Sequence, residues 1–208
     1  MRLYYAPGSC ALASHIVARE AKLPVELSKV SFNADGTRTT AEGEDFFLVN
    51  PKGGYVPAFR LDSGEVIAEG PVIMQYLADQ APASGLAPEK GTMPHYRLLE
   101  WLTFVSTELH KTFSPFFKGD ASDAEKAAAR AKLETRFAYV NGALAGKDYL
   151  LGTFTIVDAY LYTIARWSQK AEIGLDQYPE LAAFMARMET RPAVSAALME
   201  EGLVAFGA

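Results

Sequence analysis

The N-terminal part of the chain alternates short apolar runs with turn residues. Residues 2–5 predict a strand, residues 11–22 a helix with one apolar face, and residues 25–31 a second strand. Pro24 ends the helix. A strand, a helix and a strand in this order indicate a parallel sheet. Residues 32–44 are rich in Gly, Thr and charged residues, and we expect a loop or an irregular helix there.

Residues 50–77 predict a hairpin that runs directly into a helix. Two short extended runs flank the turn Asp62-Ser63-Gly64, which favours an antiparallel pair of strands. Pro71 suits the first helical position, where no backbone donor is needed. The expected buried face of this helix holds Val72, Ile73, Tyr76 and Leu77. The order of elements is that of a thioredoxin-like domain, which we place at residues 1–80.

The predicted helix N-terminus at Pro71 follows Glu69 and Gly70. Free backbone N–H groups at this point attract a carboxylate, while the Glu69 side chain attracts an ammonium group. The stretch can therefore hold a zwitterionic ligand. An ordinary hairpin capped by a surface helix explains the same residues equally well.

The periodicity becomes helical after residue 91. Residues 81–91 contain two prolines and little apolar content, and we take them as a linker to an all-α domain at residues 92–208. One predicted helix carries a buried stripe of Leu98, Leu102, Val105 and Leu109. A polar stripe about 100° around the same helix consists of Thr103, Thr107, His110 and Ser114. A solvated flank is the simplest interpretation of that polar stripe.

Two capping boxes mark further helix starts, Ser122 with Glu125 and Thr155 with Asp158. Leu133, Phe137, Val140 and Leu144 are the expected core residues of the first of these helices. Pro179 and Pro192 each begin a later helix. The predicted fold class is therefore an α/β thioredoxin-like N-terminal domain followed by an all-α helical C-terminal domain.

Composition narrows the possible partners. Half of the 208 residues are hydrophobic and the formal net charge is -5, which argues against a nucleic-acid or anionic-membrane partner. The chain shows no hydrophobic signal core and no apolar span of membrane length, so we expect a cytoplasmic protein. A single cysteine, Cys10, excludes an internal disulfide and a cysteine-based zinc site. His15, His95 and His110 are too scattered for a metal motif, and no metal is expected.

Cys10 is the candidate nucleophile. The turn Pro7-Gly8-Ser9 and the helix after it place the sulfur beside free N–H groups and the positive end of a helix dipole. This setting predicts a lowered thiol pKa, with His110 able to assist if the second domain packs it nearby. A lone cysteine is also often an inert, buried side chain, which is the competing interpretation.

Several motifs spread along nearly the whole chain resemble the bacterial beta-class cytosolic glutathione transferases. They are PGSCALASHI, NPKG, VPA, EGPVIMQYLAD, TELHKTF, FTIVDAYL and ARW. The resemblance implies a cis Val56–Pro57 peptide, pairing of the Val56 backbone with glutathione, and a cysteine that forms a mixed disulfide with glutathione. It also implies a homodimer in which the partner completes each site near Thr103 and Thr107. Ala11 and Thr103 depart from a serine and an asparagine common in that class.

The resemblance also implies a set of site residues. Cys10 and His110 are the predicted catalytic residues, and Arg38 is the candidate for the basic contact to the glycine carboxylate of glutathione. The predicted glutathione-binding residues are Cys10, Arg38, Val56, Pro57, Glu69, Gly70, Thr103, Thr107, Glu108, Leu109 and His110. The predicted electrophile pocket is lined by Phe113, Phe116 and Trp167.

The predicted activity is conjugation of glutathione, as co-substrate, to small hydrophobic electrophiles. Thiol–disulfide exchange with glutathione through Cys10 is a second activity open to such a site. Two alternatives remain at this stage. A monothiol glutaredoxin-like reductase would use the same cysteine without a resolving partner. A non-catalytic carrier of glutathione or hydrophobic ligands would share the fold and need no reactive thiol.

Overall fold

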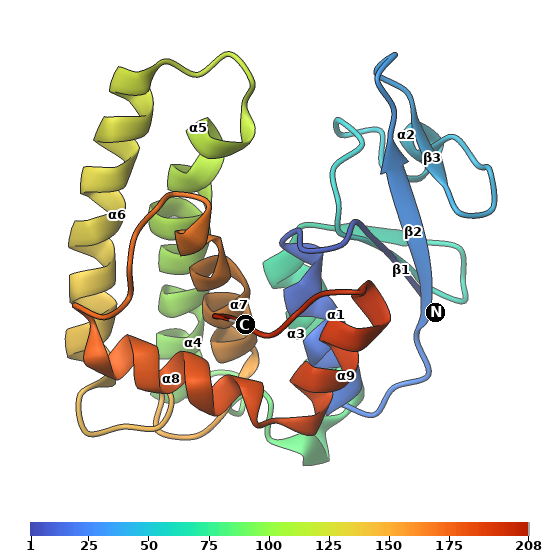
Figure 1. Ribbon diagram of the computed structural model, residues 1–208. Helices are drawn as coiled ribbons and strands as arrows, with labels where there is room; N and C mark the ends of the chain where they lie inside the picture. The colour runs from blue at the N-terminus through green and yellow to red at the C-terminus, as the bar shows by residue number, and fades with distance from the viewer. Residues whose placement is uncertain (208) are drawn as a thin grey trace.

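The computed structural model describes residues 1–207 as two packed parts, a sheet with its helices and a bundle of helices (Figure 1). The strands are β1 (Arg2–Tyr5), β2 (Glu26–Phe32), β3 (Arg38–Thr40), β4 (Ala58–Arg60) and β5 (Val66–Ala68). They form one sheet in the order β3-β2-β1-β4-β5. β1 pairs parallel with β2, as predicted, and antiparallel with β4. The predicted hairpin is the antiparallel pair of β4 and β5.

The segment expected to be a loop or irregular helix contains a strand. β3 pairs antiparallel with β2, and Val30 lies opposite Thr40. The turn between them is closed by Asp35, whose carboxylate accepts hydrogen bonds from the N–H and the hydroxyl of Thr37. Gly36 takes a φ of 85° there, which glycine adopts without a steric cost. Local polar turn chemistry makes this hairpin, so apolar periodicity did not reveal it.

Three helices accompany the sheet: α1 (Ala11–Glu20), the short α2 (Phe46–Val49) and α3 (Gly70–Gln80). α1 ends earlier than predicted, and Lys22 beyond it has a φ of 54°. On α3, Ile73, Met74 and Leu77 are buried, whereas Val72 is exposed. The expectation that Val72 faces the core is therefore wrong, because the buried face is centred one position further along the helix.

The C-terminal part is helical throughout. Its helices are α4 (Met93–Phe104), α5 (Ser114–Phe117), α6 (Asp123–Leu144), α7 (Ile156–Ala165), α8 (Pro179–Glu189) and α9 (Pro192–Glu201). Between α4 and α5 the chain forms a π-helical turn over Val105–Leu109 and a 3-10 turn over His110–Phe113. Further 3-10 turns lie at Pro82–Ser84 and Arg166–Gln169. The domain limits at residues 80 and 92 stay predictions.

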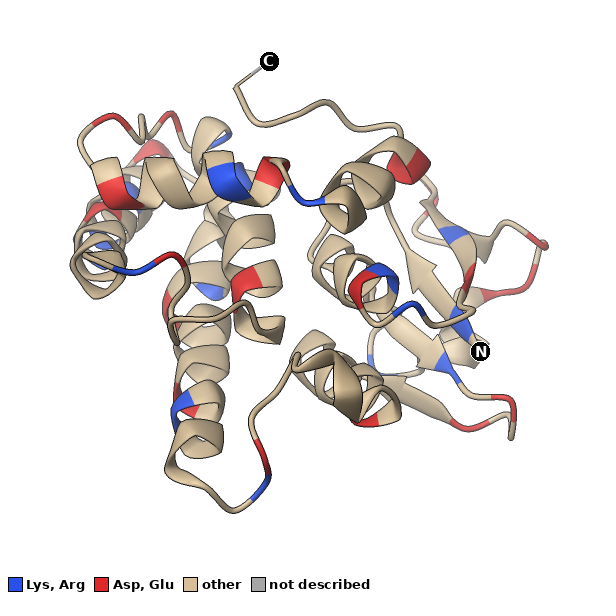
Figure 2. Cartoon of the chain, turned by 90° about the horizontal axis from the view of Figure 1, so that it is seen from below, with Lys and Arg blue, Asp and Glu red and all other residues tan. Residues whose placement is uncertain are grey.

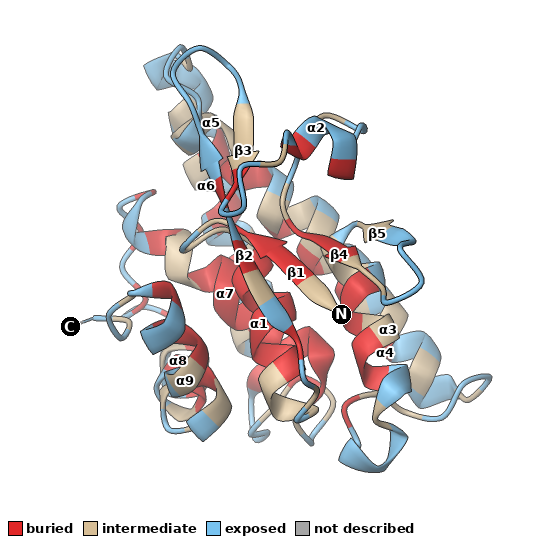
Figure 3. Ribbon diagram, turned by 90° about the vertical axis from the view of Figure 1, so that its right-hand side faces the viewer, coloured by how far each residue is buried: buried red, intermediate tan, exposed pale blue. Residues whose placement is uncertain are grey.

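The core joins the two parts around α1 and α7. Every residue of α7 is buried, and α1 packs against α3, α7 and α9. Figure 3 shows buried residues concentrated on α1 and α7 behind the sheet. The predicted apolar stripe of α4 and the following turn is confirmed, since Leu98, Leu102, Val105 and Leu109 are buried. The predicted core of α6 is confirmed in the same way at Leu133, Phe137, Val140 and Leu144.

Both predicted capping boxes are present, in different surroundings. At α6, Glu125 accepts from the N–H of Ser122 at 2.8 Å in an exposed setting. At α7, the Asp158 carboxylate is fully buried. It accepts from the N–H and hydroxyl of Thr155 at 2.8 and 3.0 Å, and from the N–H of Leu150 at 3.0 Å. Asp158 therefore ties the loop before α7 to its first turn.

Candidate active site

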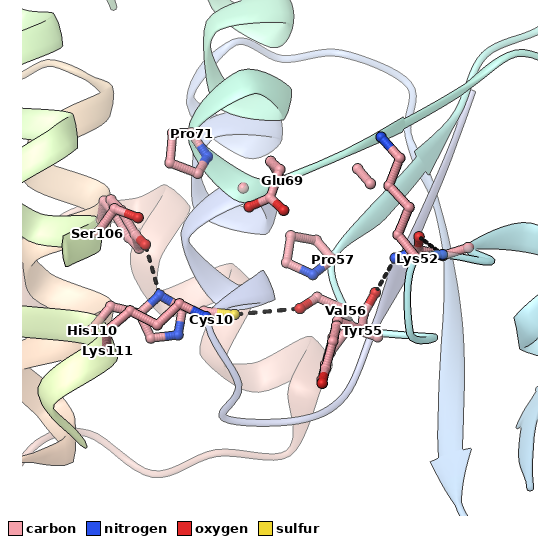
Figure 4. Close-up of a pocket in the computed structure, with 14 residues that line it drawn as sticks. Cys10, Lys52, Tyr55, Val56, Pro57, Glu69, Pro71, Ser106, His110 and Lys111 are labelled. Carbon is pink, nitrogen blue, oxygen red and sulfur yellow. Dashed lines mark hydrogen bonds between the residues drawn. The ribbon is translucent and has the colours of Figure 1, made fainter. Parts of the chain in front are cut away.

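Cys10 caps the N-terminus of α1, in the loop that follows β1 (Figure 4). Gly8 bends this loop with a φ of 70°. Its N–H donates to the Glu201 carboxylate of α9 at 3.0 Å, and its carbonyl accepts from the Trp167 indole N–H at 2.9 Å. The Cys10 thiol donates to the Val56 carbonyl at 3.4 Å. Side chains of the helical part thus hold the loop that presents the thiol.

The pKa of the Cys10 thiol is raised to about 12, and burial is the main cause. A backbone N–H of its own residue favours the thiolate, but the negative charge of Glu69 opposes it and the positive charge of Lys111 offsets that only in part. The predicted lowering of the Cys10 pKa is therefore wrong. The helix N-terminus is present as expected, yet the loss of hydration outweighs it.

His110 lines the same pocket as Cys10, on the 3-10 turn after the π-helical turn. Its Nδ1 lies 2.7 Å from the Tyr160 hydroxyl of α7, and its ring packs edge-on to Trp167. Burial, and then the charge of Lys111, lower the pKa of His110 to about 4. The imidazole is therefore neutral near pH 7. No hydrogen bond joins His110 to Cys10 in residues 1–207.

A first pocket of about 190 Å³ lies between the hairpin, the start of α3 and the turn that carries His110 (Figure 4). Of the predicted site residues, it brings together Cys10, Val56, Pro57, Glu69, Gly70 and His110. The Val56–Pro57 peptide is cis, as the resemblance implied. Glu69 takes a φ of 82° directly before α3. A carboxylate and a helix N-terminus therefore open into the same small space.

Arg38 does not line this pocket. Its guanidinium donates to the carbonyl oxygens of Gly53 and Gly54. The same group lies over the rings of Phe32, Phe47 and Tyr55 at 4.8 to 5.3 Å. Through these two carbonyls Arg38 fastens β3 to the loop before β4, and one of its guanidinium nitrogens is committed there.

Lys52 lines the first pocket instead. It lies in the NPKG stretch, between Asn50 and the hairpin, and forms no ion pair among residues 1–207; the paired lysines there are Lys90 and Lys132. Lys52 and Lys111 are therefore the lysines available to a carboxylate in this pocket, and Lys52 lines this pocket alone.

The remaining predicted glutathione contacts lie outside this pocket in the single chain. The Glu108 carboxylate is bound by Arg136 at 2.7 Å and by Lys132 at 3.3 Å, and Leu109 is completely buried in the core. Thr103 and Thr107 line a neighbouring groove against α3. A π-helical turn lies here, so the sequence positions that follow α4 do not share one helical face.

A second pocket of about 510 Å³ adjoins the first. Its walls include the aromatic side chains of Phe32, Tyr55, Phe117 and Trp167. Of the three predicted electrophile contacts, Trp167 lines it. Phe113 is fully buried and packs against the Trp167 ring at 5.7 Å, and Phe116 lines a different hollow beside Arg130. Phe117 lines the second pocket where Phe113 and Phe116 were predicted, and its ring centre lies 4.8 Å from that of Trp167.

Sequence reasoning missed several pocket residues. Lys52 and Lys111 lie inside the motifs NPKG and TELHKTF, and their positive charge was the available signal. Tyr160 lies on the uniformly buried helix α7, and its hydroxyl gives no periodic signal in the sequence. Among residues 1–207, no group of three or more His, Cys, Asp or Glu side chains is arranged to hold a metal ion.

Comparison with known proteins agrees with this architecture. The family model of the glutathione S-transferase N-terminal domain matches residues 8–80, and that of the C-terminal domain matches residues 104–192. Glutathione S-transferase GstA of Escherichia coli O157:H7 is 44% identical over 98% of this chain and 100% of its own length. Glutathione S-transferase GST-4.5 of Xanthomonas campestris is 37% identical over 98% of this chain and 100% of its own length.

Solved structures of bacterial enzymes superpose closely. BphK, a bacterial glutathione transferase in a ternary complex, has a TM-score of 0.93 at 46% identity, covering 98% of this chain and 100% of its own. A beta-class enzyme of Sphingomonas chungbukensis has the same TM-score at 39% identity and the same coverage. The fold and site are those of a thioredoxin-like domain joined to a helical domain with a cysteine at their junction. The chain belongs to the glutathione S-transferase family.

Proposed function

We propose that this protein conjugates glutathione to hydrophobic electrophiles. The main support is that the two pockets share one wall. Cys10, Tyr55, Val56, His110 and Lys111 line both of them. A thiol held at that wall from the first pocket meets an electrophile held in the second, which is the approach that a bimolecular reaction needs. A sphingomonad glutathione S-transferase with a TM-score of 0.93 was solved with glutathione bound, which supports this ligand.

The charges of the first pocket match the ends of glutathione. Glu69 attracts the γ-glutamyl ammonium, while the N-terminus of α3 at Gly70 attracts the carboxylate beside it. Lys52 serves the glycine carboxylate, in the role first assigned to Arg38. The Val56 carbonyl, which accepts the Cys10 thiol in the free chain, accepts the cysteinyl N–H of glutathione instead. The glutathione sulfur then lies beside Cys10 and His110.

At this position the chain stabilises the glutathione thiolate by hydrogen bonds. With Nδ1 of His110 accepting from the Tyr160 hydroxyl, Nε2 carries the ring proton and donates to the sulfur. The Cys10 thiol, protonated because its pKa is raised to about 12, is a second donor. The glutathione thiol loses its proton to solvent, its sulfur attacks the electrophilic carbon, and the leaving group departs.

The same raised pKa of Cys10 favours conjugation over thiol–disulfide exchange, because exchange needs Cys10 itself as a thiolate. Assays of both reactions separate the candidate functions. We expect saturable conjugation of glutathione to chlorodinitrobenzene, and slower reduction of a glutathione mixed disulfide. The reverse order would favour the glutaredoxin-like reductase, and no turnover in either assay would favour a carrier.

Replacing Glu69 with glutamine is expected to raise the KM for glutathione roughly tenfold to a hundredfold. The variant loses a charge-assisted contact to the ammonium group, worth about 1.5 to 3 kcal/mol. Steady-state kinetics with varied glutathione measure the change. Glu65→Gln is the matched control, because Glu65 is exposed on the same hairpin and lines neither pocket. An equal KM in the wild type and the Glu69 variant would remove Glu69 from the binding site.

The activity should show no titration of His110 between pH 5.5 and 8. A histidine whose pKa is lowered to about 4 stays neutral throughout this range. The logarithm of kcat/KM for glutathione should then rise with pH through one ionisation only, that of the glutathione thiol. An additional inflection near pH 6.5 that vanishes in His110→Asn would show that the imidazole titrates during catalysis.

We also propose a homodimer as the active form. Trp101 and Phe104 of α4 and Tyr139 of α6 form an aromatic cluster that stays partly exposed, and Tyr96 of α4 is also exposed. The groove of Thr103 and Thr107 shares Pro71 and Ser106 with the first pocket, so a partner seated there would reach the glutathione site. Light scattering at assay concentrations should give twice the chain mass, and a fully active monomer would refute the proposal.

Every helix within residues 1–207 is too short or too polar to span a bilayer. A cytoplasmic location stays a prediction, as do the small size and hydrophobic character of the electrophile.

A further inference from the structure

The charged side chains that line the second pocket are all positive. Lys111 and Lys118 line it, and none of its lining residues is Asp or Glu. The chain as a whole is acidic, with a formal net charge of -5. In Figure 2 basic and acidic residues are scattered over both parts of the ribbon. Two lysines without a carboxylate are therefore a local departure from the charge pattern of the molecule.

Neither lysine is neutralised within residues 1–207. The ion pairs there involve Lys90 and Lys132 but not Lys111 or Lys118. Glu125, whose pKa the charge of Lys118 helps to lower, is committed to the N–H and hydroxyl of Ser122. Both ammonium groups therefore remain available to a ligand in the pocket.

Glutathione does not account for this charge. In the proposed binding mode its ammonium group contacts Glu69, and its two carboxylates contact the start of α3 and Lys52, all in the first pocket. Lys111 lines both pockets, but Lys118 lines the second alone. Lys118 thus lies on the electrophile side of the shared wall.

The walls of the second pocket suit a flat, conjugated ligand. The Trp167 ring is fixed by its N–H bond to the Gly8 carbonyl at 2.9 Å, and Phe117 meets it edge-on at 4.8 Å. Lys170 lies 5.0 Å over the Phe117 ring, outside the pocket lining, and holds that ring in place. The pocket therefore combines an aromatic wall with cationic side chains.

We propose that the preferred electrophiles of this protein are aromatic or conjugated acids, with the apolar part against Trp167 and Phe117 and a carboxylate at Lys118 and Lys111. This inference rests on the proposed function and names the substrate class of that site. The reaction is unchanged: the glutathione S–H bond breaks, its proton goes to solvent, a sulfur–carbon bond forms, and chloride leaves with its electron pair when the electrophile is an aryl chloride.

A matched pair of electrophiles tests the inference. One is a chlorodinitrobenzoate with its carboxylate para to chlorine, and the other is the corresponding neutral carboxamide. Each kcat/KM is measured at saturating glutathione and divided by the uncatalysed rate constant with glutathione, which removes intrinsic reactivity. We expect the acid to be preferred by roughly tenfold at low ionic strength, since each exposed charge contact changes affinity about twofold to fivefold. Added salt should reduce this preference.

Lys118→Gln should lower the acid-to-amide ratio about threefold. Lys147→Gln, which removes a lysine that lines neither pocket, should leave the ratio unchanged. A normalised ratio near one in the wild type, or a ratio unaffected by Lys118→Gln, would overturn the inference about the substrate class. Conjugation of the amide in the same experiment would leave the proposed function standing. Absence of conjugation with both compounds would overturn the proposed function itself.

Discussion

Asp158→Ala is expected to lower the free energy of unfolding by about 3 to 5 kcal/mol. The carboxylate is fully buried and accepts bonds from the N–H groups of Thr155 and Leu150 and from the Thr155 hydroxyl. Alanine leaves both N–H groups buried without a partner, which costs about 1 to 3 kcal/mol each. For a chain of this length, the melting temperature should fall by roughly 10 °C. Thermal unfolding followed by circular dichroism measures both quantities.

The other capping box supplies the control. Glu125→Ala removes the corresponding acid at α6, where the group is exposed, so its loss should cost only about 0.5 to 2 kcal/mol. Conjugation by the surviving folded fraction of Asp158→Ala should be near that of the wild type. Equal destabilisation by the two variants would mean that burial does not set the cost. Loss of turnover with an unchanged melting temperature would give Asp158 a chemical role.

Alkylation of Cys10 by iodoacetamide at pH 8 should be roughly thirtyfold to a hundredfold slower than in the unfolded chain. With a pKa raised to about 12, the thiolate fraction at pH 8 is about two-thousandfold below that of an unfolded thiol with a pKa of about 8.5. The greater nucleophilicity of the more basic thiolate recovers part of the difference. Intact mass assigns the adduct without ambiguity, because the chain has one cysteine.

The same chain in denaturant is the reference for this rate. For the same reason, the mixed disulfide with oxidised glutathione should form slowly in the free protein. Alkylation as fast as in denaturant, or faster, would show that the helix N-terminus does prevail over burial. The prediction made from the sequence would then be restored, and exchange through Cys10 would become the favoured chemistry.

The parts of the fold that follow from local rules were predictable. The buried stripe from Leu98 to Leu109 and the capping box at Asp158 each lie within a few turns of chain, so spacing sufficed. The hairpin of β2 and β3 was missed because its signal is the Asp35 side chain closing a turn onto Thr37, with no apolar alternation.

The candidate site was predictable only where motifs fixed a residue's role. Cys10, Glu69 and His110 meet in one pocket, as the resemblance implied. The pKa of Cys10 was not predictable, because its cause is burial by elements distant in sequence. The role of Arg38 was not predictable either, because its guanidinium bonds the carbonyls of Gly53 and Gly54, which lie 15 and 16 residues further along the chain. Phe117, and not the predicted Phe113, lines the second pocket, because the turns after α4 place Phe113 in the core.

In the proposed reaction the sulfur of glutathione is the nucleophile, and Cys10 only donates a hydrogen bond to it. The most direct test is the kcat for conjugation of glutathione to chlorodinitrobenzene by Cys10→Ala, with both substrates saturating. Loss of one hydrogen bond worth about 1 kcal/mol predicts a fall of less than about tenfold. A folded Cys10→Ala protein whose rate does not exceed that of the uncatalysed reaction would show instead that conjugation depends on the Cys10 sulfur.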